Sequence, residues 1–489
     1  MSQNTIKLQQ ESFFVLNDAS TSRRKIVRQD RWETEPLQCY ISSNDLVIEV
    51  SNLSTFGCAC MVNETQFSFL KNHLENATGI VFKIIYTNIE TQTLTLKPVR
   101  FSKVDSDLYS VGFETINESI NVERCQAINE ANGIIATQQS ALLKMQSIPF
   151  AFRTIVFDLR HWFTSLKNQI DELEKKSPMD NAKTSDEYRL IIAEVVSEYL
   201  SKFLPSVYQK IPAQLQALTK PEKDMCVSFI REQLGPFVYG APFASRAFYK
   251  PRGYAGDYEM MNHLYRSEMV GRTLFDQCMH KYFIEEPAAN AVKNRGEYLH
   301  QKIKELVSKT PKEKTLKIMS IASGPAMEVQ LFVERNPEFY GRQIEFTCID
   351  QDEESLKHAQ KQLLSLDRQK RSGFRFKFSN MAIKNIIAQG LPENDFDLIY
   401  SAGLFDYFTD PVALLAAKQM YAGVKTGGQV IIGNYSKDNP TTALMEIVLD
   451  WILIYRSKDD MANLFSSIHK NLEIEHEPLK INLFANIYK

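Results

Sequence analysis

The sequence predicts a multidomain α/β protein made of a small antiparallel β-barrel, a helical middle region and a C-terminal doubly wound sheet that ends in an antiparallel β-hairpin. Three observations lead to this prediction. Short strand-like runs fill residues 21–120, helical periodicity dominates residues 121–308, and strands alternate with helices over residues 309–489. The first 20 residues are expected to form a tail. A chain of 489 residues also has room for roughly three domains.

The N-terminal strands are short and rich in β-branched and aromatic residues. They are expected at residues 37–43, 45–52, 80–87, 93–101 and 107–115. Strands of this length are typical of a small barrel or sandwich. Cys58 and Cys60 lie here without a second ligand pair at zinc spacing, so we expect strand cysteines and no metal site.

The middle region is expected to be a helical linker and cap. Apolar residues recur at helical spacing over residues 121–145 and 151–176, and the polar stretch 175–185 is the strongest candidate for an internal linker. Ser185 then predicts the start of another amphipathic helix, which Pro205 ends.

Strand, turn and helix alternate in the C-terminal part. Buried strands are expected at residues 315–321, 344–350, 374–379, 396–403 and 427–436, with helices such as 354–366 and 410–422 between them. This order predicts a Rossmann-like, doubly wound parallel sheet. The runs 472–478 and 481–489 are too close together for a helical crossover and therefore predict a hairpin at the sheet edge.

Composition and charge exclude several classes of protein. Hydrophobic residues make up 44% and charged residues 24% of the chain, as in an ordinary folded protein. The formal net charge of -2 gives no general attraction for DNA or RNA, so no nucleic-acid partner is expected. An odd number of scattered cysteines, 7, and the lack of a long apolar run predict a cytoplasmic protein that is not embedded in a membrane. The oligomeric state is not predicted.

A tight turn after the first C-terminal strand is a candidate ligand site. Its residues are small and let a ligand approach the backbone at the start of a helix: Ala322, Ser323, Gly324, Pro325 and Ala326. Asp350 ends the next strand, near the offset of roughly 20 residues at which a carboxylate meets ribose hydroxyls. The alternative is a tight turn followed by an unrelated aspartate.

On these residues the chain resembles the class I S-adenosylmethionine-dependent methyltransferases over residues 309–489. The resemblance implies cofactor contacts from the turn 322–326 and from Asp350, Gln351, Asn380, Met381, Ser401 and Gly403. The sequence departs from the family pattern at Ser320, where an acidic residue is common, and at Ala322 and Ala326, where glycines are usual.

A second dense segment, residues 249–262, holds two glycines among three tyrosines and suits a ligand-facing loop, with an aromatic-packed turn as the alternative. The runs GYAGDYEMMN, GLFDYF and GNYSKDNP, followed by LDWILIYRS, are similar to the methyltransferases that make methyl esters of 3-hydroxy fatty acids, a bacterial quorum-signal type. That similarity covers residues 190–489 and implies that the helical region caps the site.

Methyl transfer depends mainly on aligning the nucleophile and excluding water. A carboxylate is already ionised at neutral pH, so it needs a cation or donors rather than a base. Arg252 and Arg456 are the candidate anchors, each with a surface ion pair as the alternative. Candidates for the lining of the methyl-transfer pocket are Tyr254, Tyr407, Asn434 and Tyr435. Trp451 is a candidate for an acyl-chain wall or for a buried helix.

The N-terminal region carries two short motifs. Arg24 and Arg28 form R-x-x-x-R, while Asn52, Ser54 and Gly57 form N-x-S-x-x-G. Two arginines can clamp phosphate oxygens and stack on guanine, and a glycine lets the backbone approach a ligand. Both motifs resemble the PilZ domain over residues 20–120, which implies binding of cyclic di-GMP. A solvated basic segment is the alternative.

The sequence therefore predicts an S-adenosylmethionine-dependent carboxyl O-methyltransferase with a fatty-acid-like small-molecule substrate and a cyclic di-GMP-binding regulatory domain. The alternative is a non-catalytic cyclic di-GMP receptor that binds a partner through a methyltransferase-like fold. A third possibility, methylation of a protein carboxylate or amide, has no positive support in the sequence.

Overall fold

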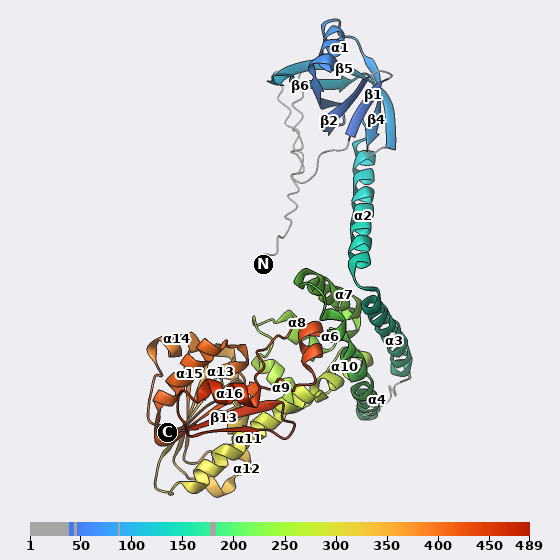
Figure 1. Ribbon diagram of the computed structural model, residues 1–489. Helices are drawn as coiled ribbons and strands as arrows, with labels where there is room; N and C mark the ends of the chain where they lie inside the picture. The colour runs from blue at the N-terminus through green and yellow to red at the C-terminus, as the bar shows by residue number, and fades with distance from the viewer. Residues whose placement is uncertain (1–38, 44–45, 87–88, 177–181) are drawn as a thin grey trace. The chain divides into compact units, whose positions relative to one another are not determined.

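The computed structural model describes residues 39–43, 46–86, 89–176 and 182–489. The chain divides into two compact units, Met1–Gln146 and Ser147–Lys489, which are coloured blue to cyan and cyan to red in Figure 1. Each unit has its own hydrophobic core. The predicted multidomain α/β class, with a small barrel, helices and a C-terminal sheet, is confirmed.

The first unit contains a closed antiparallel barrel. Among the described residues its strands are β1 (Cys39–Ser43), β2 (Leu46–Ser54), β3 (Gly57–Asn63), β4 (Ile80–Tyr86), β5 (Ile89–Asp105) and β6 (Leu108–Thr115). They are ordered β1-β2-β3-β6-β5-β4 around the barrel. Alternate residues such as Ile41, Ile48 and Phe82 fill the interior, as the strand period of two requires.

Two helices accompany the barrel. The helix α1 (Glu64–Glu75) connects β3 to β4, and α2 (Val122–Ser147) follows β6. The sequence analysis did not predict α1, which is short and buries only Phe67 and Leu70 on the barrel. Its start is fixed by a capping box, in which the Asn63 side chain accepts the Gln66 N–H and the Gln66 side chain accepts the Asn63 N–H.

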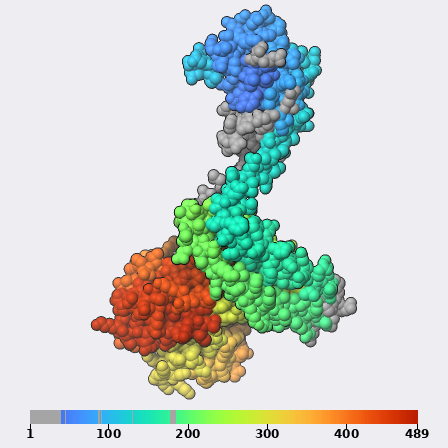
Figure 2. Space-filling model, turned by 45° about the vertical axis from the view of Figure 1, so that its right-hand side comes forward, coloured from blue at the N-terminus to red at the C-terminus, as the bar shows by residue number. Residues whose placement is uncertain are grey.

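The second unit begins with the helices of the middle region. They are α3 (Phe150–Lys175), α4 (Ala182–Phe203), α5 (Pro205–Tyr208), α6 (Lys210–Leu215), α7 (Lys220–Val238), α8 (Pro242–Tyr249), α9 (Tyr258–Arg266), α10 (Leu274–Glu285) and α11 (Pro287–Lys309). Large buried side chains on α3 and α10, among them Phe152 and Phe283, form the core of this region. Figure 2 shows the green helices packed directly against the orange and red sheet domain.

The sheet domain follows. Its strands are β7 (Leu316–Ile321), β8 (Ile344–Asp350), β9 (Phe374–Asn380), β10 (Phe396–Ser401), β11 (Val424–Tyr435), β12 (Leu472–His476) and β13 (Asn482–Tyr488). The spatial order is β12-β13-β11-β10-β7-β8-β9. The five strands from β7 to β11 are parallel to one another. Strand β13 runs antiparallel to both β11 and β12. The predicted parallel sheet and terminal hairpin are both confirmed.

Helices cover both faces of this sheet. One face carries α11, α12 (Met327–Arg335) and α13 (Glu353–Ser365), and the other carries α14 (Ile383–Gln389), α15 (Asp410–Gly423) and α16 (Lys458–Phe465). Shorter turns are η1 (Pro337–Phe339), η2 (Phe405–Tyr407) and the single π-helical turn η3 (Leu444–Val448). Within the described ranges, none of the helices is both long and apolar enough to cross a membrane.

Candidate functional site

The topology predicts a ligand-binding crevice at the carboxyl ends of β7 and β10. From β7 the chain continues to β8 on one side, whereas from β10 it continues to β11 on the other. Ligands of doubly wound sheets bind where the strand order reverses in this way. The turn 322–326 follows β7 and residues 401–403 follow β10, so two parts of the predicted cofactor site meet at this point.

The turn after β7 has a backbone conformation typical of glycine at three residues, although just one of the residues 322–326 is a glycine. Ala322, Gly324 and Ala326 have positive φ angles of 54°, 54° and 52°. The N–H of Ser323 donates to the carbonyl of Ile349 at 3.0 Å, which ties the turn to β8. A Cβ built on Gly324 would meet nothing within 4 Å, so the turn faces open space.

Asp350 closes the turn from the end of β8. Its Oδ2 accepts the N–H of Gly324 at 2.8 Å, and its Oδ1 accepts the N–H of Asp352 at 2.9 Å. The side chain is 7% exposed, and this burial raises the pKa of its carboxyl while the two N–H donors oppose the shift. Each oxygen keeps a lone pair that can accept a ligand hydroxyl.

The end of β9 joins the same cluster. The Asn380 amide donates to the carbonyls of Asp350 and Gln351 at 3.2 and 3.0 Å, and the Met381 N–H donates to the Asp350 carbonyl at 3.0 Å. The Gln351 and Asn380 side chains are exposed at the rim. The structure therefore brings together the predicted residues from three strand ends.

Ser401 and Gly403 form the opposite wall. The Ser401 hydroxyl donates to the carbonyl of Ile321 at 3.0 Å and so joins the ends of β10 and β7. A Cβ on Gly403 would lie 2.5 Å from Nη1 of Arg295, a residue of α11. A larger residue at position 403 would therefore have to displace the guanidinium of Arg295. No motif in the sequence marks Arg295.

Ser320, at the position where an acidic residue is common, has a carboxylate beside it. Oε1 of Glu328 on α12 accepts the Ser320 hydroxyl at 3.3 Å and the Tyr400 hydroxyl at 2.7 Å. Glu328 is 6% exposed, and burial raises the pKa of its carboxyl. The site thus has an acidic group from the following helix, which the sequence analysis missed.

The loop between α8 and α9 lies against the end of β8. The Arg252 guanidinium pairs with Asp352 at 3.1 Å and lies over the Tyr258 ring, 4.7 Å from its centroid. Tyr254 is half-buried, and burial together with the nearby Asp350 carboxylate raises the pKa of its hydroxyl. The predicted ligand-facing loop is therefore close to the candidate cofactor site.

The same loop touches aromatic residues that follow β10 and η3. Trp451 donates its indole N–H to the Tyr407 hydroxyl at 3.0 Å. A Cβ on Gly256 would lie 3.1 Å from that hydroxyl and 3.2 Å from the Trp451 ring. Tyr407 keeps 40% of its surface exposed at the mouth of the crevice. Trp451 itself lies outside regular structure, after η3.

Arg456 and Asn434 form a buried pair. Arg456 Nη1 donates to the Asn434 Oδ1 at 2.5 Å and to the Phe405 carbonyl at 3.0 Å, while Nη2 donates to Asp410 at 2.8 Å. The Asn434 amide donates in turn to the Ile454 carbonyl at 2.9 Å. Both side chains are satisfied by contacts within the protein and fix the segment after β10.

Tyr435 connects the sheet to the helical cap. Its hydroxyl donates to the carbonyl of Ala288 at the start of α11, at 2.9 Å, and its N–H donates to the Asp406 carboxylate at 2.5 Å. Tyr435 is 3% exposed. Burial raises the pKa of Asp406 to about 6, and the Tyr435 N–H opposes this shift.

In the barrel, Arg24 and Arg28 lie outside the described residues. Asn52 and Ser54 lie in the last part of β2, and the Ser54 hydroxyl donates to the Gly57 carbonyl at 2.9 Å. A Cβ on Gly57 would lie 2.0 Å from the carbonyl oxygen of Phe113 on β6. The pairing of β3 with β6 therefore already requires glycine at position 57.

Part of the chain is similar to a known protein family and to solved structures. Residues 312–476 match the family model described as a methyltransferase domain, and no curated protein sequence matches the chain. A possible exported protein from Bordetella parapertussis is 13% identical, with a TM-score of 0.39, over 61% of this chain and 97% of that chain.

Two methyltransferase structures are also similar. Magnesium protoporphyrin IX methyltransferase from Synechocystis PCC 6803, with bound SAM, is 9% identical, with a TM-score of 0.29, over 42% of this chain and 85% of that one. The 1,6-didemethyltoxoflavin-N1-methyltransferase of Burkholderia thailandensis is 13% identical, with a TM-score of 0.28, over 41% and 79%. Likenesses of this degree carry no conclusion about the substrate of this chain.

Proposed function

We propose that this protein, whose residues 312–476 form a methyltransferase domain, uses S-adenosylmethionine to convert a small-molecule carboxylate to its methyl ester. The proposed substrate class is the 3-hydroxy fatty acids, and the proposed ligand of the N-terminal barrel is cyclic di-GMP. The observation that carries the transferase part is Asp350, which joins the strained turn after β7 at the reversal of strand order.

The residues of the crevice fit the proposed cofactor. The open face of Gly324 gives a nucleoside access to the backbone, and Asp350 offers acceptors for ribose hydroxyls. Glu328 supplies a buried carboxylate that suits an ammonium group. S-adenosylmethionine would supply a sulfonium-bound methyl group, and its transfer to a carboxylate oxygen leaves a methyl ester and S-adenosylhomocysteine with no proton to move.

The chain's own residues then have positioning roles. Arg252 and Asp352 hold the loop 250–257 against the end of β8, where it would limit the access of water to the bound ligands. Arg456 and Asn434 fix the segment that carries Tyr407. Tyr254, Tyr407 and Tyr435 would offer hydroxyl groups and ring faces beside the acceptor. Such a site aligns an anionic acceptor without a general base.

Support for the barrel's proposed role comes from its fold and its motif residues. The six-stranded barrel holds Asn52 and Ser54 near the end of β2, beside the turn to β3. Arg24 and Arg28 add the second motif in the sequence. Phosphate clamping by two arginines is the chemistry that a cyclic dinucleotide requires.

The test incubates purified full-length protein with methyl-labelled S-adenosylmethionine and 3-hydroxydecanoate, with and without cyclic di-GMP. We expect label in an organic-soluble ester. Replacing Asp350 with Ala should weaken S-adenosylhomocysteine binding, measured by calorimetry, at least about tenfold, because the variant loses the carboxylate that accepts the N–H groups of Gly324 and Asp352 and would accept the ribose hydroxyls. Asp367→Ala, at an exposed aspartate of the same domain, is the matched control.

Other distributions of label would contradict the proposal. Label in the protein fraction would indicate a protein substrate instead of a fatty acid. Cofactor and dinucleotide binding without any transfer to 3-hydroxy acids or to a bacterial extract would favour the non-catalytic receptor. If the Asp350 and Asp367 variants bound S-adenosylhomocysteine with equal affinity, the cofactor would not bind at the end of β8.

A further inference from the structure

Arg295 is a buried cation that forms no salt bridge with the residues that the structure describes. It lies on α11 and is 7% exposed. In the part of the chain that the structure describes, no carboxylate comes within 4.0 Å of its guanidinium nitrogens, and its Nε has no hydrogen-bond partner. Nη2 donates to the sulfur of Met261 at 3.8 Å, and the Tyr265 hydroxyl is a further neighbour. The buried carboxylates of Glu328 and Asp406 attract this charge from beyond 4.0 Å. An anion in direct contact would compensate for more of its lost hydration.

The guanidinium lies at the wall of the candidate site. It approaches Gly403 so closely that a Cβ there would come within 2.5 Å of Nη1. Burial raises the pKa of Asp406 to about 6 and also raises that of the Tyr435 hydroxyl, and the positive charge of Arg295 opposes both shifts. Arg295 is therefore within electrostatic reach of the groups proposed to surround the acceptor.

One face of α11 connects this cation to an apolar cavity. Ala288, Val292 and Arg295 are spaced four and three residues apart, which puts them on the same side of the helix. Ala288 and Val292 line a narrow cavity of about 20 Å³ together with Tyr435 and Trp451. Most of its wall is apolar, and Glu286 and Thr441 add polar groups. A cation about one helical turn from an apolar cavity suits an amphiphilic anion.

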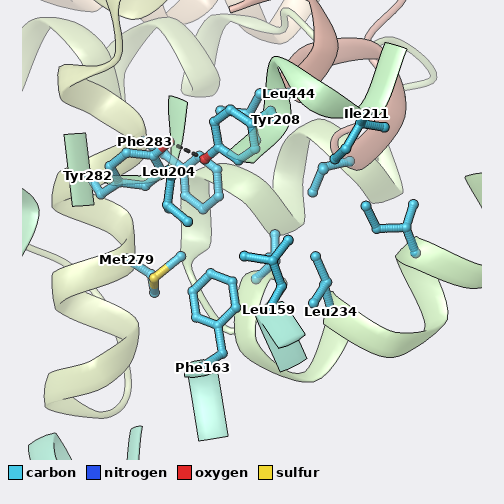
Figure 3. Close-up of a pocket in the computed structure, with 13 residues that line it drawn as sticks. Leu159, Phe163, Leu204, Tyr208, Ile211, Leu234, Met279, Tyr282, Phe283 and Leu444 are labelled. Atoms are coloured by element: carbon cyan, nitrogen blue, oxygen red, sulfur yellow. Dashed lines mark hydrogen bonds between the residues drawn. The ribbon is translucent and has the colours of Figure 1, made fainter. Parts of the chain in front are cut away.

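A second cavity lies next to the first, between the helices. It is also about 20 Å³ in volume and shares Phe283 and Leu444 with the first. Figure 3 shows its lining, with Met279, Leu159 and Phe163 opposite the hydrogen-bonded tyrosines. Leu444 begins the π-helical turn η3, a conformation that is frequent at functional sites.

We propose that Arg295 binds the carboxylate of the acceptor and that the apolar cavity beside α11 widens to take its hydrocarbon tail. This inference rests on the proposed function and names the residues that would select a fatty acid. Arg252 and Arg456, by contrast, already have carboxylate partners in the protein. Arg295 has none within 4.0 Å among the described residues, and its planar fork matches a carboxylate. A long chain needs the flexible Met445 side chain in the wall to move aside.

The test measures binding directly and does not depend on turnover. Calorimetry follows 3-hydroxydecanoate binding to full-length protein saturated with S-adenosylhomocysteine, in the wild type and in Arg295→Gln. The variant should bind the acid at least about 30-fold more weakly, because the charge-assisted pair is lost. Its affinity for S-adenosylhomocysteine should stay within about threefold of the wild-type value, since the binding proposed for Arg295 involves the acceptor.

The control is Arg342→Gln. Arg342 is another buried arginine, 8% exposed, whose guanidinium donates to the carbonyls of Thr310 and Pro311. It should leave the affinity for the acid unchanged. Arg295→Lys keeps a cation in the same place and provides a second variant if the glutamine protein does not fold. It should bind the acid with intermediate affinity, since it loses the bidentate geometry.

Three results would overturn the inference. These are equal acid binding by wild type and Arg295→Gln, no acid binding by the wild type, and an equal loss of S-adenosylhomocysteine affinity in the variant. The last result would assign Arg295 to the carboxylate of the cofactor. Binding that depends on Arg295 but leads to no methyl ester would instead refute the proposed reaction and leave the carboxylate site standing.

Discussion

Ala322 and Ala326 keep a backbone conformation that costs an alanine energy. Both have positive φ angles, 54° and 52°, and the left-handed region costs an L-residue roughly 1–2 kcal/mol. The two methyl groups differ in their surroundings. Ala326 is fully buried in the core beneath the turn, whereas Ala322 is only half-buried. Burial of the methyl group therefore offsets less of the backbone strain at Ala322 than at Ala326.

Replacing Ala322 with Gly should stabilise the protein by about 1 kcal/mol, because the strain is relieved and little apolar burial is lost. Thermal denaturation should show a rise of about 2 °C. Ala326→Gly is the matched control, since the loss of its buried methyl group, about 0.8 kcal/mol, offsets the relief. A fall in the midpoint for Ala322→Gly would contradict this account of the turn.

Which site residues the sequence could predict depends on how local their pattern is. The turn 322–326 and Asp350 follow consecutive strands, so strand ends in the sequence are strand ends in space. Glu328 on α12 reaches back to Ser320 on β7, and Arg295 on α11 approaches Gly403 after β10. No local spacing in the sequence marks either residue. The pairing of Arg456 with Asn434 and Asp410 likewise depends on the tertiary fold.

At the scale of elements, the start of α11 contains a buried acid. Glu286 precedes the helix, is 5% exposed, and lines the cavity beside Ala288. Burial raises the pKa of its carboxyl to about 7, and a hydrogen bond with Tyr282 opposes the shift. The Tyr282 hydroxyl is hydrogen-bonded to Tyr208, as Figure 3 shows. The folded state therefore holds the Glu286 proton more tightly than the unfolded state does.

This raised pKa predicts a stability that falls as pH rises. The contribution of Glu286 is fully present below its ordinary pKa of 4.5 and is lost as pH rises through about 7. Glu286→Gln is neutral at every pH, so its stability relative to the wild type should increase from pH 5 to pH 8, by up to about 3 kcal/mol. Urea denaturation across this range measures it. Glu313→Gln, at an exposed position, is the control and should show the same pH dependence of stability as the wild type. If the free energy of unfolding of Glu286→Gln changed with pH in parallel with that of the wild type, the raised pKa of Glu286 would be refuted.

Regular elements were easier to predict than irregular ones. The strands of the sheet show long buried patterns, such as the wholly buried β10, and this pattern is visible in the sequence. Helix α1 has too few buried residues to give a helical period. The π-helical turn η3 and the extended segment after it depend on tertiary partners, since Arg231 on α7 and Tyr239, which follows α7, donate to the carbonyls of Ile447 and Val448.

At the scale of the whole molecule, the proposed regulation requires that ligand binding in one compact unit change ligand binding in the other. A dinucleotide bound to the barrel can change methyl transfer only if its affinity differs between states that bind the acceptor or cofactor differently. Such coupling must be reciprocal for equilibrium binding. This requirement holds whatever the arrangement of the two units.

If the proposed regulation exists, cyclic di-GMP should change the affinity for S-adenosylhomocysteine and 3-hydroxydecanoate by a factor between about 5 and 150. These two ligands together should change the affinity for cyclic di-GMP by the same factor, because both routes lead to the same fully bound protein. Calorimetry in both orders on the full-length protein measures the two factors. Arg28→Ala should remove both effects and leave S-adenosylhomocysteine binding intact, since position 28 lies outside the unit that carries the cofactor site. Arg31→Ala, a basic neighbour outside the R-x-x-x-R motif, should retain both effects. Tight dinucleotide binding with a factor of one in each direction would make the barrel a receptor that does not control the transferase.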